Sequence, residues 1–132
     1  MKVLLIEDDK IEQMKLQRVT SKLDLNLEVT SAENGEQALE VLAAVEEINL
    51  IVLDLNMPRM NGLEFLTELR KNDKWKFVPV VVLTTSSHKE DIHSAYRLGI
   101  SGYLVKPLRY EDYSTLVSAM FNYWTNCELF RN

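Results

Sequence analysis

The sequence predicts a doubly wound α/β fold in which five parallel strands alternate with five helices. Three aliphatic runs, at residues 3–6, 50–53 and 80–83, are typical of strands buried on both faces of a parallel sheet. Segments with helical periodicity separate these runs. Residues 25–30 alternate apolar and polar side chains, which indicates an edge strand with one face in water.

The first part of the chain begins with the strand at residues 3–6 and continues into a helix over about residues 10–23. The apolar positions of that helix form a loose stripe: Ile11, Met14, Leu16, Val19 and Leu23. After the edge strand comes a helix with apolar residues at the spacing i, i+3, i+4 and i+7, which are Ala38, Val41, Leu42 and Val45.

The strand at residues 50–53 leads through a turn into a third helix. Asn61 is placed to cap that helix, with Glu64 three residues later and Gly62 easing its start. The apolar stripe that follows consists of Leu63, Leu66 and Leu69.

The strand at residues 80–83 is followed by Ser87 and Glu90, which form a capping pair for a fourth helix, and Gly99 ends that helix. A short fifth strand is predicted at residues 103–105. The last helix is defined by its apolar residues: Tyr113, Leu116, Val117, Met120 and Trp124.

Strict alternation of strand and helix implies right-handed crossovers and a parallel sheet with helices on both faces. The half-wet second strand belongs at an edge, and the aliphatic first, third and fourth strands belong in the interior. The flavodoxin-like order 2-1-3-4-5 satisfies both conditions. Ligands of such sheets bind at the carboxyl ends of the strands, near the switch point between the first and third strands.

The bulk composition narrows the function classes. The 132 residues suffice for one domain with one core, and a formal net charge of −5 argues against nucleic-acid binding through a basic face. The single cysteine, Cys127, suits a reducing compartment. The N-terminal apolar run is too short for a signal peptide or a membrane span. We therefore expect a cytoplasmic protein with one domain at residues 1–126, a tail at 127–132 and no output domain.

Carboxylates gather at the predicted switch point. The first strand ends in Glu7-Asp8-Asp9 and the third in Asp54. Clustered carboxylates need a cation to stay ionised, and Mg²⁺ prefers oxygen ligands with one or two carboxylates among them. Asp8 and Asp54 are the expected ligands, with Glu7 acting through water and a backbone carbonyl just past Asp54 completing the set. A carboxylate can also act as a nucleophile and form an aspartyl-phosphate.

A hydroxyl and an ammonium are predicted at the same edge. Thr84 ends the fourth strand and Lys106 follows the fifth. Both can donate hydrogen bonds to phosphoryl oxygens on Asp54, and positioning with charge neutralisation is what phosphoryl transfer requires.

Each of these residues has a simpler explanation when it is taken alone. The acidic triplet can be a solvated strand end with an Asp capping the next helix, and Asp54 can be a turn residue. Thr84 can belong to the approach to a helix, and Lys106 can be an ordinary surface lysine. These explanations leave the joint placement of the residues unaccounted for.

Four motifs resemble the receiver domains of bacterial two-component response regulators: LLIEDD (4–9), LDLNMPRMNG (53–62), VVVLTTS (80–86) and GYLVKP (102–107). The resemblance runs from about residue 2 to residue 124. Among these receivers, the chain resembles the stand-alone chemotaxis regulators. A weaker resemblance links the chain to receivers that partner phytochrome-type kinases.

The resemblance implies a role for each matching residue. Asp54 would be the phosphoacceptor, and Mg²⁺ would be held by Asp8, Asp54, the main-chain carbonyl of Asn56 and the neighbouring acid Glu7. Thr84 would be the switch hydroxyl and Lys106 the phosphate-binding lysine. Tyr103 would be the aromatic residue whose rotamer reports the state of the site. The Lys106-Pro107 bond would be cis, and Asn56 with Ser86 would tune the phosphoryl lifetime.

The resemblance also implies a switch protein rather than an enzyme. It would accept a phosphoryl group from a sensor histidine kinase or a phosphotransfer protein. The fourth helix, fifth strand and fifth helix would then change their surface for a downstream protein target, relay phosphotransfer or a homodimer. Phe121 and Tyr123, near the two margins of the apolar stripe of the last helix, are candidates for that surface. Neither a nucleic acid nor a membrane is expected as a partner.

Two other function classes fit the sequence less well. A phosphatase with an aspartate nucleophile would carry D-x-D at the first strand, whereas Asp54 lies on the third and Asn56 stands where the second Asp would be. A flavodoxin would need a Ser/Thr/Gly phosphate loop after the first strand, where Glu7-Asp8-Asp9 would repel a phosphate in the absence of a metal.

Overall fold

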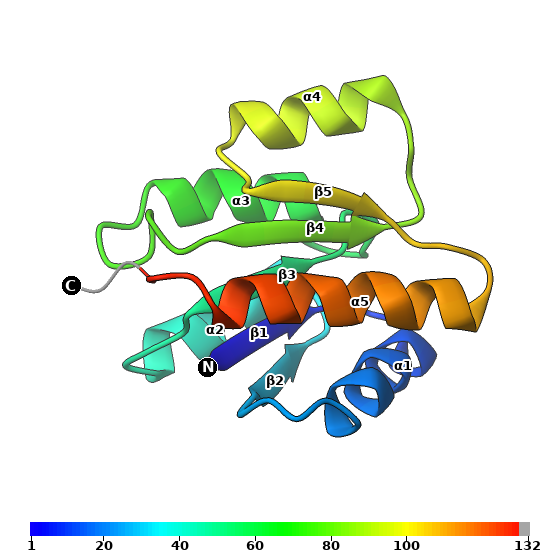
Figure 1. The fold of residues 1–132 in the computed structure, drawn as a ribbon. Coiled ribbons are helices and arrows are strands. Elements are labelled where there is room, and N and C mark those ends of the chain that lie inside the picture. Colours follow the sequence, from blue (N-terminus) through cyan, green and yellow to red (C-terminus); the bar gives the residue numbers. More distant parts are fainter. Residues whose placement is uncertain (130–132) are drawn as a thin grey trace.

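All five strands lie in one parallel sheet in the order β2-β1-β3-β4-β5 (Figure 1). The computed structural model describes residues 1–129. The strands are β1 (Lys2–Ile6), β2 (Glu28–Ala32), β3 (Leu50–Leu53), β4 (Val80–Thr84) and β5 (Gly102–Val105). The predicted fold class and strand order are therefore confirmed.

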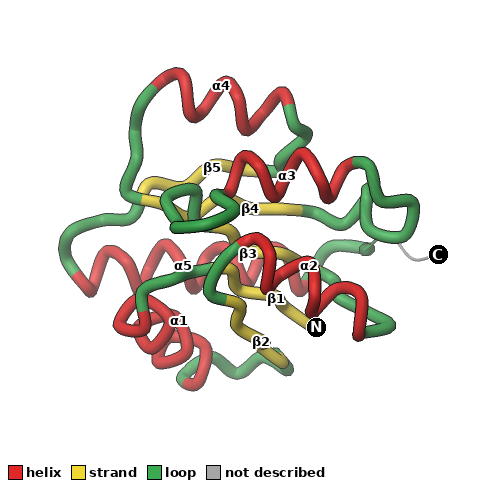
Figure 2. The backbone as a smooth tube through the Cα atoms, turned by 180° about the vertical axis from the view of Figure 1, so that it is seen from behind, coloured by secondary structure: helices red, strands yellow, loops and turns green. Residues whose placement is uncertain are grey.

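Helices cover both faces of the sheet, as Figure 1 and the reverse view in Figure 2 show. The helices are α1 (Lys10–Ser21), α2 (Gly35–Ala44), α3 (Gly62–Arg70), α4 (Lys89–Arg97) and α5 (Tyr110–Thr125). Helices α1 and α5 pack on one face and contribute Leu16, Val19, Tyr113, Val117, Met120 and Phe121 to its core. Residues of α2, α3 and α4 build the core on the other face.

The interior strands explain the aliphatic runs in the sequence. Every side chain of β3 is fully buried, with Leu50 and Val52 in the core beneath α1 and α5, and Ile51 and Leu53 in the opposite core. Successive side chains of a strand point to opposite faces, so a strand covered on both faces needs an apolar residue at every position.

The second strand begins later than its alternating pattern predicted. It pairs with β1 from Lys2↔Glu28 to Ile6↔Ala32 and so occupies residues 28–32 rather than 25–30. The pairing begins where β1 begins, because the Met1 carbonyl accepts a hydrogen bond from the Glu28 N–H at 3.0 Å. Leu25 and Leu27 pack against the α1/α5 core from the preceding loop instead.

The stripe predicted for the first helix is partly wrong. Ile11 and Met14 are 69% and 66% exposed, and Gln13 is buried in their place. Asp9 caps α1 and accepts from the Ile11 N–H, which sets the rotation of the helix. That rotation turns Gln13 inward, where its amide donates to the Glu7 carbonyl at 2.6 Å.

The two predicted capping pairs have different outcomes. Asn61 and Glu64 form the expected reciprocal capping box at α3. The pair of Ser87 and Glu90 does not form, because α4 begins at Lys89 and no side chain of the described residues caps it. The Ser86 hydroxyl instead donates to Asp91 at 2.6 Å, inside the first turn of α4.

Gly99 ends the fourth helix as predicted. Its φ of 79° lies in the left-handed region, and its N–H donates to the Tyr96 carbonyl at 3.0 Å. At the last helix, Phe121 is fully buried, so the prediction that it belongs to a partner surface is wrong, whereas Tyr123 is 63% exposed. Within residues 1–129, no helix combines the length and the apolarity needed to cross a membrane.

Candidate functional site

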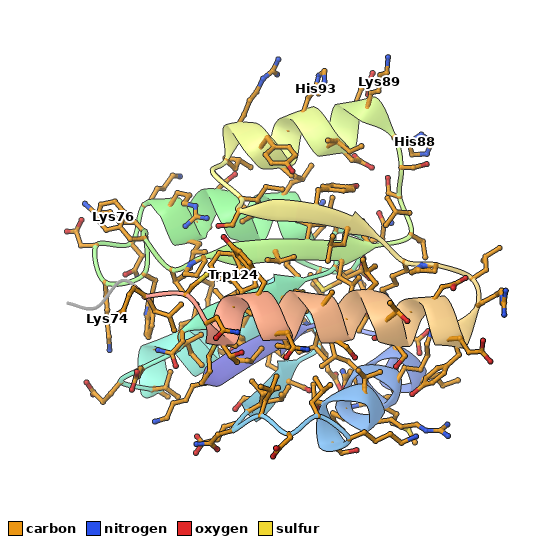
Figure 3. All side chains as sticks on the ribbon, viewed as in Figure 1. Lys74, Lys76, His88, Lys89, His93 and Trp124 are labelled. Atoms are coloured by element: carbon orange, nitrogen blue, oxygen red, sulfur yellow. The ribbon has the colours of Figure 1, made fainter. Side chains whose placement is uncertain are left out.

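The candidate site lies at the carboxyl ends of four strands. Glu7 follows β1, Asp54 follows β3, Thr84 ends β4 and Lys106 follows β5. These are the strand ends that the sequence placed at the switch point, and ligands of doubly wound sheets bind there. The two histidines of the chain, His88 and His93, are exposed, and Figure 3 shows His93 on the outer side of α4 and His88 at the start of that helix.

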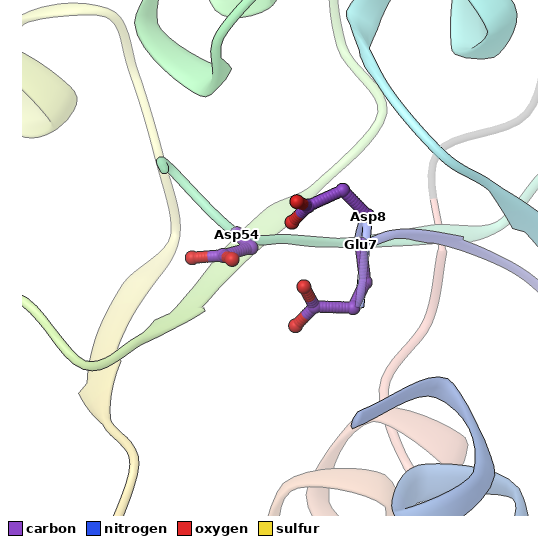
Figure 4. A group of neighbouring side chains, drawn as sticks. All are labelled: Glu7, Asp8 and Asp54. Carbon is purple, nitrogen blue, oxygen red and sulfur yellow. The ribbon is translucent and has the colours of Figure 1, made fainter. Parts of the chain in front are cut away.

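Three carboxylates face a common space at this edge. One oxygen each from Glu7, Asp8 and Asp54 lies within 4.8 Å of the other two, and Figure 4 shows the three side chains together with their carboxylates pointing the same way. We call these residues the acidic triad. Glu7 and Asp54 are buried, whereas Asp8 is exposed. Such an oxygen set, open to water on one side, fits Mg²⁺, which keeps several waters and takes few protein ligands.

Lys106 supplies positive charge to the triad through Glu7. Its ammonium lies 2.6 Å from Glu7 Oε1, and both side chains are almost completely shielded from water. Sequence reasoning missed this ion pair because it joins residues 99 positions apart. The burial of both groups makes the pair sensitive to any other charge at the site.

The electrostatics of the site reflect this crowding. Burial raises the pKa of Glu7 from 4.5 to about 7, with the charge of Asp54 adding to the rise and Lys106 opposing it. Burial acts to lower the pKa of Lys106, but its hydrogen bond with Glu7 and the nearby carboxylate charges outweigh burial and raise that pKa. Excess negative charge at the triad is therefore only partly neutralised by the protein.

Thr84 carries an orphaned hydroxyl. The residue is completely buried, and its Oγ1 has no hydrogen-bond partner among the described residues. A buried hydroxyl without a partner costs free energy, so its presence at the end of the strand next to the one that leads to Asp54 favours a functional reason.

Tyr103 and Ser86 form the neighbouring contact. The Tyr103 hydroxyl donates to the Ser86 carbonyl at 2.9 Å, in the segment between β4 and α4. The ring is half-buried and packs against the core that α3 and α4 cover. Tyr103 thus links β5 to the segment that follows Thr84.

The loop after Asp54 holds the carboxylate in place. The Asn56 N–H donates to Asp54 Oδ1 at 3.4 Å, and the Asn56 side chain is exposed. Gly62 lies against the same loop: a Cβ added to it would come within 2.7 Å of the Asp54 carbonyl oxygen. The Gly35 N–H donates to the Met60 carbonyl at 3.0 Å and ties the start of α2 to this loop.

The structure brings the predicted residues Glu7, Asp8, Asp54, Thr84 and Lys106 to one edge of the sheet, and it corrects one detail. The Lys106-Pro107 peptide bond is trans, so the expected cis bond is wrong. Sequence reasoning also missed Gln13 and Glu12, which reach the site from the first turns of α1: Gln13 bonds to the Glu7 carbonyl, and Glu12 Oε1 lies 3.6 Å from Lys106 Nζ. Their position within one turn of the acidic triplet was the available signal.

Comparison with known proteins agrees with this geometry. The family model described as response regulator receiver domain matches residues 3–118. Response regulator Rcp1 of Synechocystis is 34% identical over 128 residues, covering 92% of this chain and 87% of Rcp1. Chemotaxis protein CheY1 of Helicobacter pylori is 32% identical over 107 residues, covering 81% and 86%.

Solved structures give the same result. The phosphorylated cyanobacterial phytochrome response regulator RcpA superposes with a TM-score of 0.93 at 29% identity, over 98% of each chain. The Mn²⁺-bound form of Rcp1 superposes with a TM-score of 0.91 at 31% identity, over 98% of this chain and 99% of that one. The chain belongs to the response regulator receiver domain family, whose members are signalling switch proteins.

Proposed function

We propose that this chain is a phosphorylation-controlled switch that accepts a phosphoryl group on Asp54 in a Mg²⁺-dependent reaction. The observation that carries the proposal is the pairing of three converging carboxylates with a buried, unpartnered Thr84 hydroxyl at one sheet edge. Neither a phosphatase nor a flavodoxin is proposed, because the receiver family model covers most of the chain.

Asp8, Glu7, Asp54 and the Asn56 carbonyl are the groups that would hold Mg²⁺, and the ion would neutralise charge on phosphoryl oxygens during transfer. An oxygen of Asp54 forms the new bond to phosphorus while the bond from phosphorus to the donor atom breaks, and the donor leaves with the bonding electrons. Because Glu7 and Asp54 are buried, water screens the charges at the reacting carboxylate only weakly.

Thr84 and Lys106 receive the phosphoryl oxygens in this proposal. The Thr84 hydroxyl has no competing acceptor to give up among the described residues. Lys106 has Glu7 as its present partner and exchanges that carboxylate for a phosphoryl oxygen. The phosphoryl group carries a charge of roughly −1.5 to −2 in place of the −1 of the Asp54 carboxylate, and this added charge attracts both donors.

The signal leaves the site through the contact between Tyr103 and Ser86, and Ser86 lies two residues after Thr84 in the chain. Movement of Thr84 alters the packing of Tyr103 and with it the surface of α4, β5 and α5. Exposed apolar side chains support an interaction role for that surface, including Tyr96, Val105 and Tyr123. The proposed uses are binding of a downstream protein, relay phosphotransfer or homodimer formation.

The proposed phosphoryl donor is a sensor histidine kinase or a phosphotransfer protein. Exposed apolar groups close to the site in the chain support docking of a protein donor: Ile11 and Met14 on α1, and Leu108 two residues after Lys106. The single cysteine supports a cytoplasmic setting for this partnership.

The test is incubation with acetyl phosphate and Mg²⁺, followed by intact-protein mass spectrometry. We expect one phosphoryl group on the wild-type chain and none on Asp54→Asn. Asp73→Asn is the matched control, because Asp73 is an exposed carboxylate outside the triad. Labelling of Asp54→Asn at the wild-type level would remove Asp54 from its proposed role.

A further inference from the structure

Glu12 is a second carboxylate at Lys106 and does not belong to the acidic triad. Its Oε1 lies 3.6 Å from Lys106 Nζ, while Glu7 Oε1 lies 2.6 Å from the same nitrogen. The Lys106 side chain is 6% exposed, so its charge is compensated by neighbouring carboxylates rather than by water.

The two glutamates are placed differently with respect to the triad. Glu7 is a member, so its charge is divided between Lys106 and any cation that the triad takes. Glu12 stands on the first turn of α1, where the helix dipole favours an acidic side chain, and lies outside the triad. Its charge therefore remains available to Lys106 when Glu7 is engaged.

Further contacts fix Glu12 beside the site. Lys15 Nζ lies 2.9 Å from Glu12 Oε2, one turn further along α1. This oxygen is buried and makes an ion pair with Lys15 but no hydrogen bond with the described residues. Lys15 also lies over the ring of Tyr113 on α5, 4.4 Å from the ring centroid. The side chain of Glu12 is thus held in place independently of Lys106.

We propose that Glu12 is a positioning residue that retains Lys106 at the site when Glu7 turns to a cation in the triad. The inference rests on the proposed function, because it gives Glu12 a part in the same Mg²⁺-dependent reaction. Without Glu12, occupation of the triad would leave a shielded ammonium short of negative charge. Glu12 therefore makes the triad easier to fill and keeps Lys106 near the oxygens of Asp54.

The test is a double-mutant cycle read by Mn²⁺ binding to the full chain at pH 8, with free Mn²⁺ measured by electron paramagnetic resonance. Glu12→Gln removes the charge and keeps the shape, and Lys106→Met removes the cation. We expect Glu12→Gln to weaken Mn²⁺ binding about five-fold when Lys106 is present and less than about two-fold in Lys106→Met. Equal losses in the two backgrounds would overturn the inference, because Glu12 would then act on the ion directly.

Two further variants distinguish a positioning role of Glu12 from the loss of any nearby negative charge and from a purely structural role. Glu33→Gln removes an exposed carboxylate that pairs with Lys10 rather than Lys106, and it should weaken Mn²⁺ binding less than about two-fold. Glu12→Asp keeps the charge and should bind Mn²⁺ more tightly than Glu12→Gln. Losses that are the same in Glu12→Asp and Glu12→Gln, with a lowered unfolding temperature in both, would mean a structural role and would also overturn the inference.

The same titrations distinguish this inference from the proposed function. A wild-type chain that takes no Mn²⁺ would defeat both. A wild-type chain that binds Mn²⁺, with Glu12→Gln binding it equally well, would defeat the positioning role and leave the proposed function standing.

Discussion

The ammonium of Lys106 and the carboxylate of Glu7 lie 2.6 Å apart, and each side chain is more than nine-tenths shielded from water. The pair does not fully satisfy Glu7, whose pKa is raised to about 7, chiefly by burial. The folded chain therefore holds a proton that the unfolded chain releases between about pH 4.5 and pH 7. The contribution of Glu7 to the free energy of unfolding falls as the pH rises through that window, by about 1–3 kcal/mol.

Urea unfolding of the wild-type chain and Glu7→Gln, in EDTA at pH 5 and pH 8, checks this prediction. The difference in the free energy of unfolding, wild type minus Glu7→Gln, should decrease between the two values. Mg²⁺ at pH 8 should restore part of the wild-type stability, because a bound cation stabilises the ionised carboxylates. If that difference in EDTA were the same at pH 5 and pH 8, the assignment of the pH dependence to Glu7 would be contradicted.

Thr84→Val should stabilise the unphosphorylated chain. The substitution replaces a buried hydroxyl that has no partner among the described residues with a methyl group of similar size. Removal of the unsatisfied group should raise the free energy of unfolding by about 1 kcal/mol. The same variant should lose most of the extra stability that wild type gains from beryllofluoride with Mg²⁺. Thr85→Val is the control, because Thr85 is exposed; equal gains in the two variants would argue against the orphaned hydroxyl as the cause.

Gly62→Ala should destabilise the chain and impair phosphorylation together. The new Cβ would meet the Asp54 carbonyl oxygen and the Leu55 Cα, both at 2.7 Å, and both belong to backbone that cannot turn aside. We expect a loss of about 2–4 kcal/mol in urea unfolding, with slower labelling by acetyl phosphate. Gly102→Ala is the matched control, because a Cβ added at Gly102 would have none of the described atoms within 4 Å. If Gly62→Ala changed neither stability nor labelling, the loop after Asp54 would have to move easily to accommodate the new Cβ.

Arg70→Met should destabilise the chain, because it removes the hydrogen bonds that connect α3 to the neighbouring segments. The guanidinium donates to the carbonyls of Lys76 and Val78 before β4 and to those of Leu98 and Gly99 after α4, at 2.8–3.1 Å. Charge-assisted bonds of this kind make a loss of about 3 kcal/mol the expected result in urea unfolding. Arg97→Met removes an exposed arginine of α4 and should change stability by less than about 0.5 kcal/mol. Similar values for the two variants would rule out the carbonyl contacts as the source.

The sequence allowed prediction of those parts of the fold that depend on burial on two faces. Residues 50–53 are all apolar, so they fit only a strand that is covered on both faces. Once the strand order is known, the topology alone brings strand ends such as Asp54 and Thr84 together. The first helix was harder, because its rotation depends on which Asp caps it. With Asp9 as the cap, Ile11 faces outward and Gln13 faces inward, which is the opposite of what the apolar stripe predicted.

Pairwise contacts across the chain could not be predicted from the sequence. Ser87 has the right spacing to Glu90 for a cap, but the competing bond from Ser86 to Asp91 occupies the first turn of α4. Phe121 lies at the margin of the apolar stripe and is nevertheless fully buried in the α1/α5 core, because the helix packs with a wider face than the stripe suggested. Glu12 was similarly unforeseen, since its partner Lys106 comes from the far end of the sheet.

The separation of Glu7 and Lys106 by 99 positions in the chain has a consequence for folding during synthesis. A ribosome delivers β1 to β4, with Glu7, Asp8 and Asp54, before it delivers Lys106. Until β5 arrives, the growing chain carries a group of like charges with no Lys106 to offset them, and its outer strand β4 has an open edge. Docking of the last strand closes that edge and neutralises part of the charge in one step, so the final strand both completes the sheet and completes the site.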